Sequence, residues 1–138
     1  MWYYRNEVFD PKIDELDPKK DIGFVYIIHN LVNGRMYVGK KLFFSSKSKQ
    51  VKGKRKKFKV ESDWRKYYGS NAAIQQDVQD LGITSFRREI LHLCISKSEC
   101  SYWEAHEQFS RNAILSKSYY NDWIQVKITR KHLKRLQK

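Results

Sequence analysis

The sequence predicts a small α/β domain of the α+β type, in which an antiparallel three-stranded sheet is flanked by helices. Residues 23–29 are β-branched or aromatic, and Asn33-Gly34 is a strong hairpin signal, so residues 35–39 are expected to return as a second strand. Residues 86–94 alternate apolar and polar side chains, which is typical of a half-buried third strand. Helical patterns between and after these strands supply the flanking layer.

Local signals predict the remaining short elements. Residues 2–9 are rich in aromatic side chains, so we expect an extended segment that Asp10-Pro11 turns. Residues 63–68 predict a short helix, and residues 119–121 are expected to close a loop. A short helix is also expected in the basic end of the chain.

Two longer helices are predicted from their ends. Ser70 is the expected cap of a helix over residues 71–81, whose apolar side chains share one face, and Gly82 ends it. Ser96-x-x-Glu99 has the pattern of a capping box and predicts a helix that continues to about Arg111.

The charge balance favours a polyanionic partner. The chain of 138 residues has 28 Lys and Arg against 15 Asp and Glu, a formal net charge of +13. The 41% of hydrophobic residues argues against a disordered basic tail, because this much apolar material can offset the entropy cost of folding. We therefore expect a folded protein whose partner is a nucleic acid or an anionic membrane surface.

No segment predicts a membrane or an export route. The longest apolar stretches fall far short of the ~20 residues that a membrane helix needs, so no membrane partner is expected. No secretion signal opens the chain, and Cys94 and Cys100 are expected to be reduced packing residues. A cytoplasmic location follows as the expectation, in a host cell if the protein is phage-encoded.

A basic insertion and a basic tail stand out from an otherwise single domain. Residues 40–59 hold ten Lys and Arg and no acid, and residues 127–138 hold six and no acid. We expect the insertion to be a loop, with a folded-back ribbon as the alternative. Because so many cations repel one another unless a polyanion is bound, the following residues are predicted to bind nucleic acid through its phosphates: Lys41, Lys47, Lys49, Lys52, Lys54, Arg55, Lys56, Lys57 and Lys59.

The predicted hairpin brings two tyrosines together. Tyr26 and Tyr37 lie on adjacent strands joined by a tight turn, so they can lie side by side. Gly39 leaves space for a backbone or a phosphate, and Lys40 follows it directly. Taken alone, strand tyrosines are more often packing residues of the core, so the spacing and the lysine decide in favour of a site.

These motifs resemble a known family. Gly23-Phe24-Val25-Tyr26, ten residues, and then Tyr37-Val38-Gly39 are similar to the core of the GIY-YIG nucleases, and the later elements follow that family's order. Residues 64–70 (Trp-Arg-Lys-Tyr-Tyr-Gly-Ser) also resemble phage-borne, homing-endonuclease-like members. The resemblance covers about residues 22–122 of one domain that spans residues 1–138.

The resemblance implies roles for the hairpin residues. Tyr26 matches the tyrosine thought to act as general base on the attacking water, with a phenol pKa lowered by neighbouring cations. Tyr37 matches the tyrosine that orders water and phosphate. Lys40 matches a lysine that stabilises charge on the scissile phosphate. Phosphodiester hydrolysis needs such a proton acceptor and such cations.

The resemblance also implies roles further along the chain. Arg65 is the best match to the family's arginine, with Lys66 and Lys41 as rivals. Glu104 matches the carboxylate that holds one Mg²⁺ or Mn²⁺ ion per active site, and Glu107 is its rival. One carboxylate suffices because water and the substrate phosphate complete the coordination of a hard cation.

Asn121 matches an asparagine near the end of the family's fold and completes the expected catalytic set. Signatures of other nuclease classes are missing: no Glu is followed by x-Lys, the four His residues do not form an H-N-H pattern, and no phosphate loop is present.

The sequence thus predicts a metal-dependent endonuclease acting on double-stranded DNA, similar to homing endonucleases. A catalytically inactive nucleic-acid-binding module of the same fold is one alternative, and a structure-specific repair or junction nuclease is another. Cutting both strands needs two active sites, which a homo-oligomer would supply.

Overall fold

Strand β3 (Gly23–Asn30) is the centre of the fold in the computed structural model, which describes residues 1–137. All of its residues except His29 are buried, which is typical of a strand covered on both faces. It pairs antiparallel with β4 (Met36–Leu42) on one side and with β7 (Phe86–Cys94) on the other. These three strands are the ones that the sequence predicts.

The predicted sheet of three antiparallel strands is too small, because the sheet is five-stranded and mixed. Strands β1 (Trp2–Tyr4) and β2 (Glu7–Phe9) extend it, with the order β2-β1-β7-β3-β4. Arg5 and Asn6 turn the chain between them with φ of 51° and 65°. Strand β1 pairs in parallel with β7, more than 80 residues away, so no local pattern indicates it.

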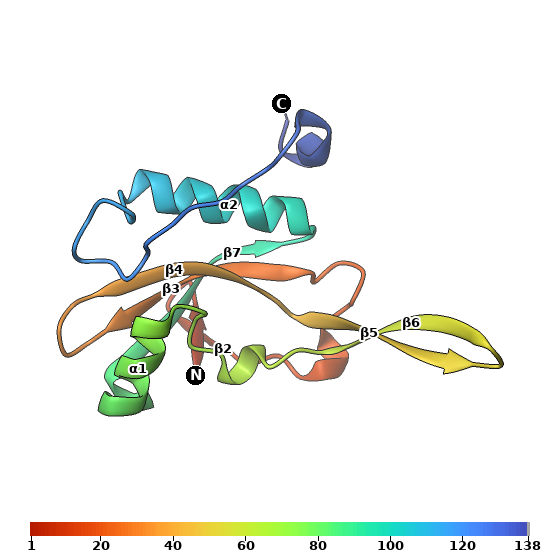
Figure 1. Cartoon of the computed structure of the whole chain (residues 1–138), viewed down its shortest axis with the longest axis horizontal. Coiled ribbons are helices and arrows are strands. Elements are labelled where there is room, and N and C mark those ends of the chain that lie inside the picture. Colours follow the sequence, from red (N-terminus) through yellow and green to blue (C-terminus); the bar gives the residue numbers. More distant parts are fainter. Residues whose placement is uncertain (138) are drawn as a thin grey trace.

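Helices cover both faces of the sheet (Figure 1). Helix α2 (Lys97–Ser110) lies along one face, and α1 (Ala72–Leu81) lies on the other side. Short 3-10 segments complete the chain: η1 (Ile13–Glu15), η2 (Trp64–Lys66), η3 (Ile83–Ser85) and η4 (Arg130–Leu136). The predicted short helices at residues 63–68 and in the basic tail are therefore found in 3-10 form. Lys138, the last residue of that tail, lies outside the described residues.

The helix caps differ in detail from the prediction. Asn71, rather than Ser70, caps α1, and its side chain accepts the N–H groups of Ala73 and Ile74. An amide and a hydroxyl are both good caps, so sequence alone does not decide between adjacent residues. The Ser70 hydroxyl is instead 3.1 Å from the Tyr37 hydroxyl.

Ser96 caps α2 as predicted, because its hydroxyl accepts the N–H of Glu99. The Glu99 side chain does not complete the capping box. It forms an ion pair with Arg135 of η4, which fastens the end of the described chain to the start of α2.

The basic insertion is a two-stranded ribbon. Strands β5 (Phe44–Val51) and β6 (Lys54–Glu61) pair antiparallel over their whole length. Lys52 and Gly53 turn the chain with φ of 50° and 75°, the positive angles that tight β-hairpins need. The expected loop is wrong and the ribbon alternative is confirmed. The ribbon projects from the body of the protein (Figure 1).

Two cores lie on opposite faces of the sheet. The larger one, on the side of α1 and η2, contains Trp2, Phe24, Tyr26, Phe43 and Trp64 with other buried apolar residues. The smaller one lies under α2 and includes Val25, Ile27, Val38 and the two buried, unpaired cysteines, Cys94 and Cys100. No helix among the described residues meets the length and hydropathy of a membrane span.

Candidate active site

The outer edge of β4 is the end of the five-stranded sheet, and a later segment covers its first half. The Met36 N–H donates to the Ser118 carbonyl at 2.8 Å, and the Met36 carbonyl accepts the Tyr120 N–H at 2.7 Å. Two residues on, the Asn121 side chain accepts the Val38 N–H at 3.0 Å and donates to the Val38 carbonyl at 2.8 Å. The edge is thereby closed up to Val38.

Asn121 acts as a substitute for a partner strand. Both polar atoms of its amide are used by the backbone of Val38, and the side chain is buried. Gln108 of α2 also donates to the Val38 carbonyl, at 3.2 Å. The structure therefore places Asn121 at the predicted site as the residue that positions β4.

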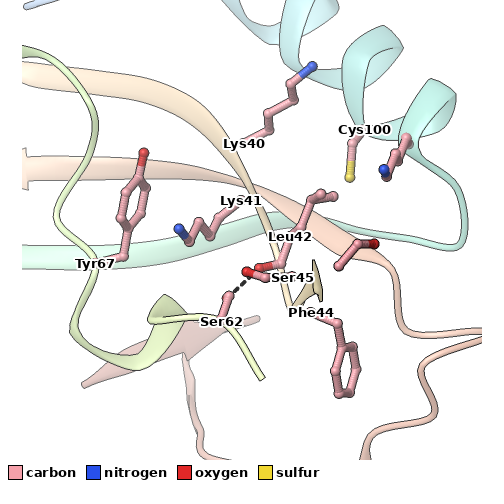
Figure 2. Close-up of a pocket in the computed structure, with 10 residues that line it drawn as sticks. Lys40, Lys41, Leu42, Phe44, Ser45, Ser62, Tyr67 and Cys100 are labelled. Atoms are coloured by element: carbon pink, nitrogen blue, oxygen red, sulfur yellow. Dashed lines mark hydrogen bonds between the residues drawn. The ribbon is translucent and has the colours of Figure 1, made fainter. Parts of the chain in front are cut away.

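The edge opens at Lys40. Beyond it, the Ser62 hydroxyl donates to the Leu42 carbonyl at 2.6 Å (Figure 2). At the opening, the Glu104 carboxylate of α2 lies near the backbone N–H of Lys40, which lowers the pKa of the carboxyl. The Lys40 ammonium is 4.0 Å from Glu104 Oε1 and donates to the Ser101 hydroxyl at 2.7 Å. A cation and a carboxylate thus meet at an unpaired stretch of backbone.

A cavity of about 610 Å³ lies at this opening. Tyr37, Lys40, Glu104 and Asn121 line it together with Asp122, Trp123 and residues 125–127. The structure brings together four of the six residues predicted to be catalytic.

Tyr26 does not line this cavity, but its ring lies next to that of Tyr37, which does. It is opposite Gly39 in the β3–β4 pair and is fully buried. A Cβ atom on Gly39 would lie 2.7 Å from Tyr26 Cζ and collide with the Tyr26 hydroxyl, so only glycine leaves room for the phenol. The Tyr26 and Tyr37 ring centroids are 6.2 Å apart, which confirms that the two tyrosines are neighbours.

The site is assembled around the edge of the sheet rather than on one face. Side chains alternate along a strand, so Tyr37 and Lys40 of β4 point to opposite faces. Tyr37 packs against the larger core, whereas Lys40 is directed toward α2 (Figure 2). Glu104 and the phenols therefore approach the same edge from opposite sides.

Burial is the main cause of the raised pKa values of the tyrosines and of Glu104 in the site. It raises the pKa of Tyr26 well above that of a free phenol, and Tyr67 and Tyr37 raise it further. Burial also raises the pKa of Tyr37, although the hydrogen bond with Ser70 opposes it. The pKa of Tyr26 is thus shifted in the direction opposite to the one that the resemblance implied.

Glu104 and its rival Glu107 have different environments. Burial raises the pKa of Glu104, and Lys40 lowers it by less. Burial also acts on Glu107, but hydrogen bonds from His92 at 2.8 Å and Arg111 at 2.9 Å outweigh it and leave its pKa below the usual value. Glu107 is committed to these partners, whereas Glu104 faces the cavity, so the geometry favours Glu104 as a metal ligand.

The structure does not bring Arg65 into this cavity. Its guanidinium donates to Glu61 Oε1 at 2.6 Å and to Asp10 Oδ1 at 2.9 Å, and it lies 4.4 Å from the centre of the Trp64 ring. These contacts anchor η2 to the segment that follows β2. The backbone of η2 is held from the other side by Arg88, which donates to the carbonyl of Arg65 at 3.0 Å.

Neither rival of Arg65 lines the cavity. The Lys41 ammonium is 2.6 Å from Asp63 Oδ1 and 4.1 Å from the centre of the Tyr67 ring. Lys66 is exposed on η2. Sequence reasoning missed Tyr67, a third phenol whose ring centroid is 6.0 Å from that of Tyr26. The Tyr-Tyr-Gly-Ser end of the 64–70 motif was the available signal.

The donor set fits one hard cation held mainly by other ligands. Among residues 1–137, no three His, Cys, Asp or Glu side chains gather to form a closed metal site. Glu104 lines the cavity, and Asp122 lines the same cavity. Mg²⁺ is commonly held by one or two carboxylates with water and substrate phosphate, so these residues fit it.

Comparisons with known proteins give a family model and a curated relative that match the sequence. A family model described as "Putative endonuclease segE, GIY-YIG domain" matches residues 2–124. The "Putative endonuclease segE" of Enterobacteria phage T4 is 35% identical over 98 residues, which cover 71% of this chain and 39% of the phage protein. The match therefore spans about two fifths of that relative. No solved structure matches the chain.

The first prediction concerns the closure of β4. Asn121→Ala leaves the Val38 N–H without its partner, so we expect a loss of about 1–3 kcal/mol in the free energy of unfolding, measured with urea. Asn33→Ala is the matched control, because Asn33 also accepts a backbone N–H but is exposed. Equal effects of the two substitutions would contradict this role of Asn121.

The second prediction is a pair of opposite pH effects. The folded pKa of Glu104 is raised, so its charge costs stability at pH values above that pKa, and the cost vanishes below the unfolded pKa. Glu104→Gln should therefore raise the melting temperature at pH 7 and leave it unchanged near pH 3.

Glu107→Gln is the control with the reverse sign. The folded pKa of Glu107 is lowered, so its charge stabilises the protein above the unfolded pKa, and this stabilisation is lost as the pH falls through the folded pKa. The variant should melt lower than the wild type at pH 7, with a difference that disappears in acid. Shifts of the same sign for both variants would refute this account.

Proposed function

Because the chain belongs to the GIY-YIG endonuclease family, as a segE-like member, we propose that it hydrolyses phosphodiester bonds in double-stranded DNA with one divalent metal ion. The observation that carries this proposal is the cavity at the open edge of β4, where Tyr37, Lys40 and Glu104 meet and where the ring of Tyr26 lies next to that of Tyr37. We propose homing-endonuclease-like cutting in a host cytoplasm, as the phage-encoded relative suggests.

Glu104 is the residue that would hold Mg²⁺ or Mn²⁺. When bound, the ion stabilises negative charge that develops on the phosphate and the leaving oxygen. The Lys40 ammonium lies beside this carboxylate and is directed to the cavity, so it stabilises charge on the same phosphate. The Tyr37 hydroxyl, hydrogen-bonded to Ser70, orients water and phosphate.

Tyr26 is proposed as the proton acceptor for the attacking water. A buried phenol is neutral at pH 7, so it can accept a proton only if its pKa falls. Positive charge brought to the cavity favours the phenolate and lowers this pKa. Glycine at position 39 is what lets the phenol reach the edge where that charge collects.

One observation favours a second candidate function, a catalytically inactive DNA-binding module. Full burial and a raised pKa are the ordinary state of a structural tyrosine, and Tyr26 has both. In that case the protein binds DNA through its basic ribbon without cutting. A repair or junction nuclease would use the same site chemistry on a different DNA structure. A homo-oligomer would supply the second site for cutting both strands.

The third prediction tests the chemistry. Wild-type protein should convert supercoiled plasmid to nicked or linear DNA with Mg²⁺ and not with EDTA. Glu104→Gln should lower the rate at least about 100-fold, because charge stabilisation at the phosphate is lost. Glu107→Gln should stay within a few-fold of wild type at equal folded concentration, since His92 and Arg111 hold Glu107 away from the cavity.

Two outcomes would decide against parts of this assignment. DNA binding by the wild type without any cleavage supports the inactive module. A larger loss of activity in Glu107→Gln than in Glu104→Gln would move the metal site to Glu107.

The fourth prediction separates Lys40 from Arg65. Lys40→Ala should lower the cleavage rate about 100-fold with little change in the melting temperature, because its ammonium faces the cavity. Arg65→Ala breaks contacts with Glu61 and Asp10, so it should mainly lower stability, with the rate per folded molecule within a few-fold of wild type.

Measurement of rate and melting temperature on the same preparations distinguishes the two effects. A rate for Arg65→Ala that falls by orders of magnitude in a fully folded protein would restore Arg65 to the catalytic set.

A further inference from the structure

The β5–β6 ribbon is regular, but most of its side chains are exposed and do not belong to the core of the protein. Its strands pair along all of their residues, and the side chains from Ser45 to Gln50 and from Lys54 to Lys59 are exposed. Between Phe44 and Val60 it carries eight cations and no acid: Lys47, Lys49, Lys52, Lys54, Arg55, Lys56, Lys57 and Lys59. Such a surface is complementary in charge to a polyanion.

The register divides the ribbon into two chemically different faces. Residues directly opposite in an antiparallel pair point to the same side. One side, the polar face, consists of Ser46, Ser48 and Gln50 opposite Lys59, Lys57 and Arg55. The other side, the lysine face, consists of Lys47, Lys49 and Val51 opposite Phe58, Lys56 and Lys54.

Side-chain contacts agree with this division. Arg55 Nη1 is 3.4 Å from the Ser48 hydroxyl on the polar face. The Lys49 ammonium lies 5.9 Å from the centre of the Phe58 ring on the lysine face. No contact of this kind crosses between the two faces among the described residues.

The polar face combines cations with uncharged side chains that can form hydrogen bonds with DNA bases. Gln50 and Arg55 lie directly opposite each other near the tip. In the major groove, Gln pairs in a bidentate manner with adenine and Arg with guanine, and Lys and Ser also contact base edges. The lysine face has neither Gln nor Arg, so the polar face is the one better suited to recognising bases.

The ribbon also has the dimensions of a groove-binding element. A two-stranded ribbon fits the DNA major groove, which is about 12 Å wide. Strands of this length extend roughly 25 Å, most of one DNA turn of about 34 Å. The deep and narrow major groove of duplex RNA does not admit such an element, so DNA is favoured over RNA.

The root of the ribbon leads to the proposed active site. A second cavity, of about 450 Å³, is lined by Lys40 and Lys41 of β4 and by Ser45 and Ser46 of β5 (Figure 2). Lys40 also lines the cavity that contains Glu104. A DNA strand that follows the positive charge from the ribbon root therefore passes the catalytic residues.

We propose that the β5–β6 ribbon enters the major groove of double-stranded DNA, reads base edges with its polar face and contacts phosphates with its lysines. The ribbon then determines which phosphate is placed at Lys40 and Glu104. The inference rests on the proposed function for its substrate, but it concerns sequence selection, which cleavage chemistry alone does not supply.

The fifth prediction tests base recognition by the ribbon. Binding is measured in EDTA, so that no metal is present and no cleavage occurs. Wild-type protein is used to select bound duplexes from a random-sequence DNA library, which should yield a preferred sequence. Gln50→Ala with Arg55→Ala should lower the preference at the contacted positions about tenfold or more, while affinity for random DNA falls less.

Lys49→Ala with Lys56→Ala is the matched control. These residues also lie directly opposite each other, one position along, but on the lysine face. This variant should weaken binding to all sequences, flatten its salt dependence and leave the preferred sequence unchanged. Both pairs are exposed, and equal melting temperatures would verify that the fold is intact.

Base analogues in the preferred duplex identify the groove. Replacing a contacted guanine by 7-deazaguanine removes the major-groove N7 acceptor and should weaken binding, whereas hypoxanthine lacks only the minor-groove amino group and should not. The reverse pattern, a library without any preferred sequence, or a preference that survives in Gln50→Ala with Arg55→Ala would overturn the proposal. Equal binding to duplex RNA would do so too.

The outcomes also separate this inference from the proposed function. Cleavage with Mg²⁺ but without sequence preference would support the proposed endonuclease activity and refute base recognition by the β5–β6 ribbon. Sequence-specific binding without cleavage would support base recognition by the ribbon in a catalytically inactive protein.

Discussion

The unpaired outer edge of β4 is the constraint on which the rest of the site depends. A strand at the end of a sheet exposes N–H and C=O groups that must find partners. Here the partners come from three places: the backbone of residues 118–120, the Asn121 amide and the Ser62 hydroxyl. Between these partners, at Lys40, the edge meets the Glu104 carboxylate and the cavity. The edge of β4 is closed at Val38 and at Leu42 but is open at Lys40, and the cavity lies at this opening.

Under the proposed function, this arrangement would let groups on opposite faces of a sheet act on one phosphate. Glu104 comes from the helix that covers one face, and the phenols belong to the core of the other. They meet only because β4 has no strand on its outer side and because Gly39 has no side chain to separate the Tyr26 hydroxyl from the edge. A larger residue at position 39 or a sixth strand beside β4 would part them.

Sequence reasoning predicted what depends on local pattern. The β3–β4 hairpin, strand β7 and helix α2 follow from β-branched runs, alternation and a cap, and the proximity of Tyr26 and Tyr37 follows from the hairpin. It missed what depends on distant contacts. The parallel pairing of β1 with β7 has no local signature. Arg65 fits its expected role by position in the chain, yet Glu61 and Asp10 hold it away from the cavity. The many basic residues between positions 44 and 61 obscure any alternation of apolar and polar side chains, so the sequence predicts the two strands of the ribbon only as an alternative to a loop.

The active-site cavity contains a carboxylate, Glu104, whose negative charge is disfavoured by burial. Burial raises the pKa values of Glu104, Tyr37 and Tyr26 together, so the ionised carboxylate is held against its preference for water. A core built only for stability would place an apolar side chain at position 104, as it does at the neighbouring Ala105. A bound cation would relieve the same cost that burial imposes, since it favours the carboxylate and the phenolate alike. The destabilised charge is therefore consistent with the proposal that Glu104 serves a ligand rather than the fold.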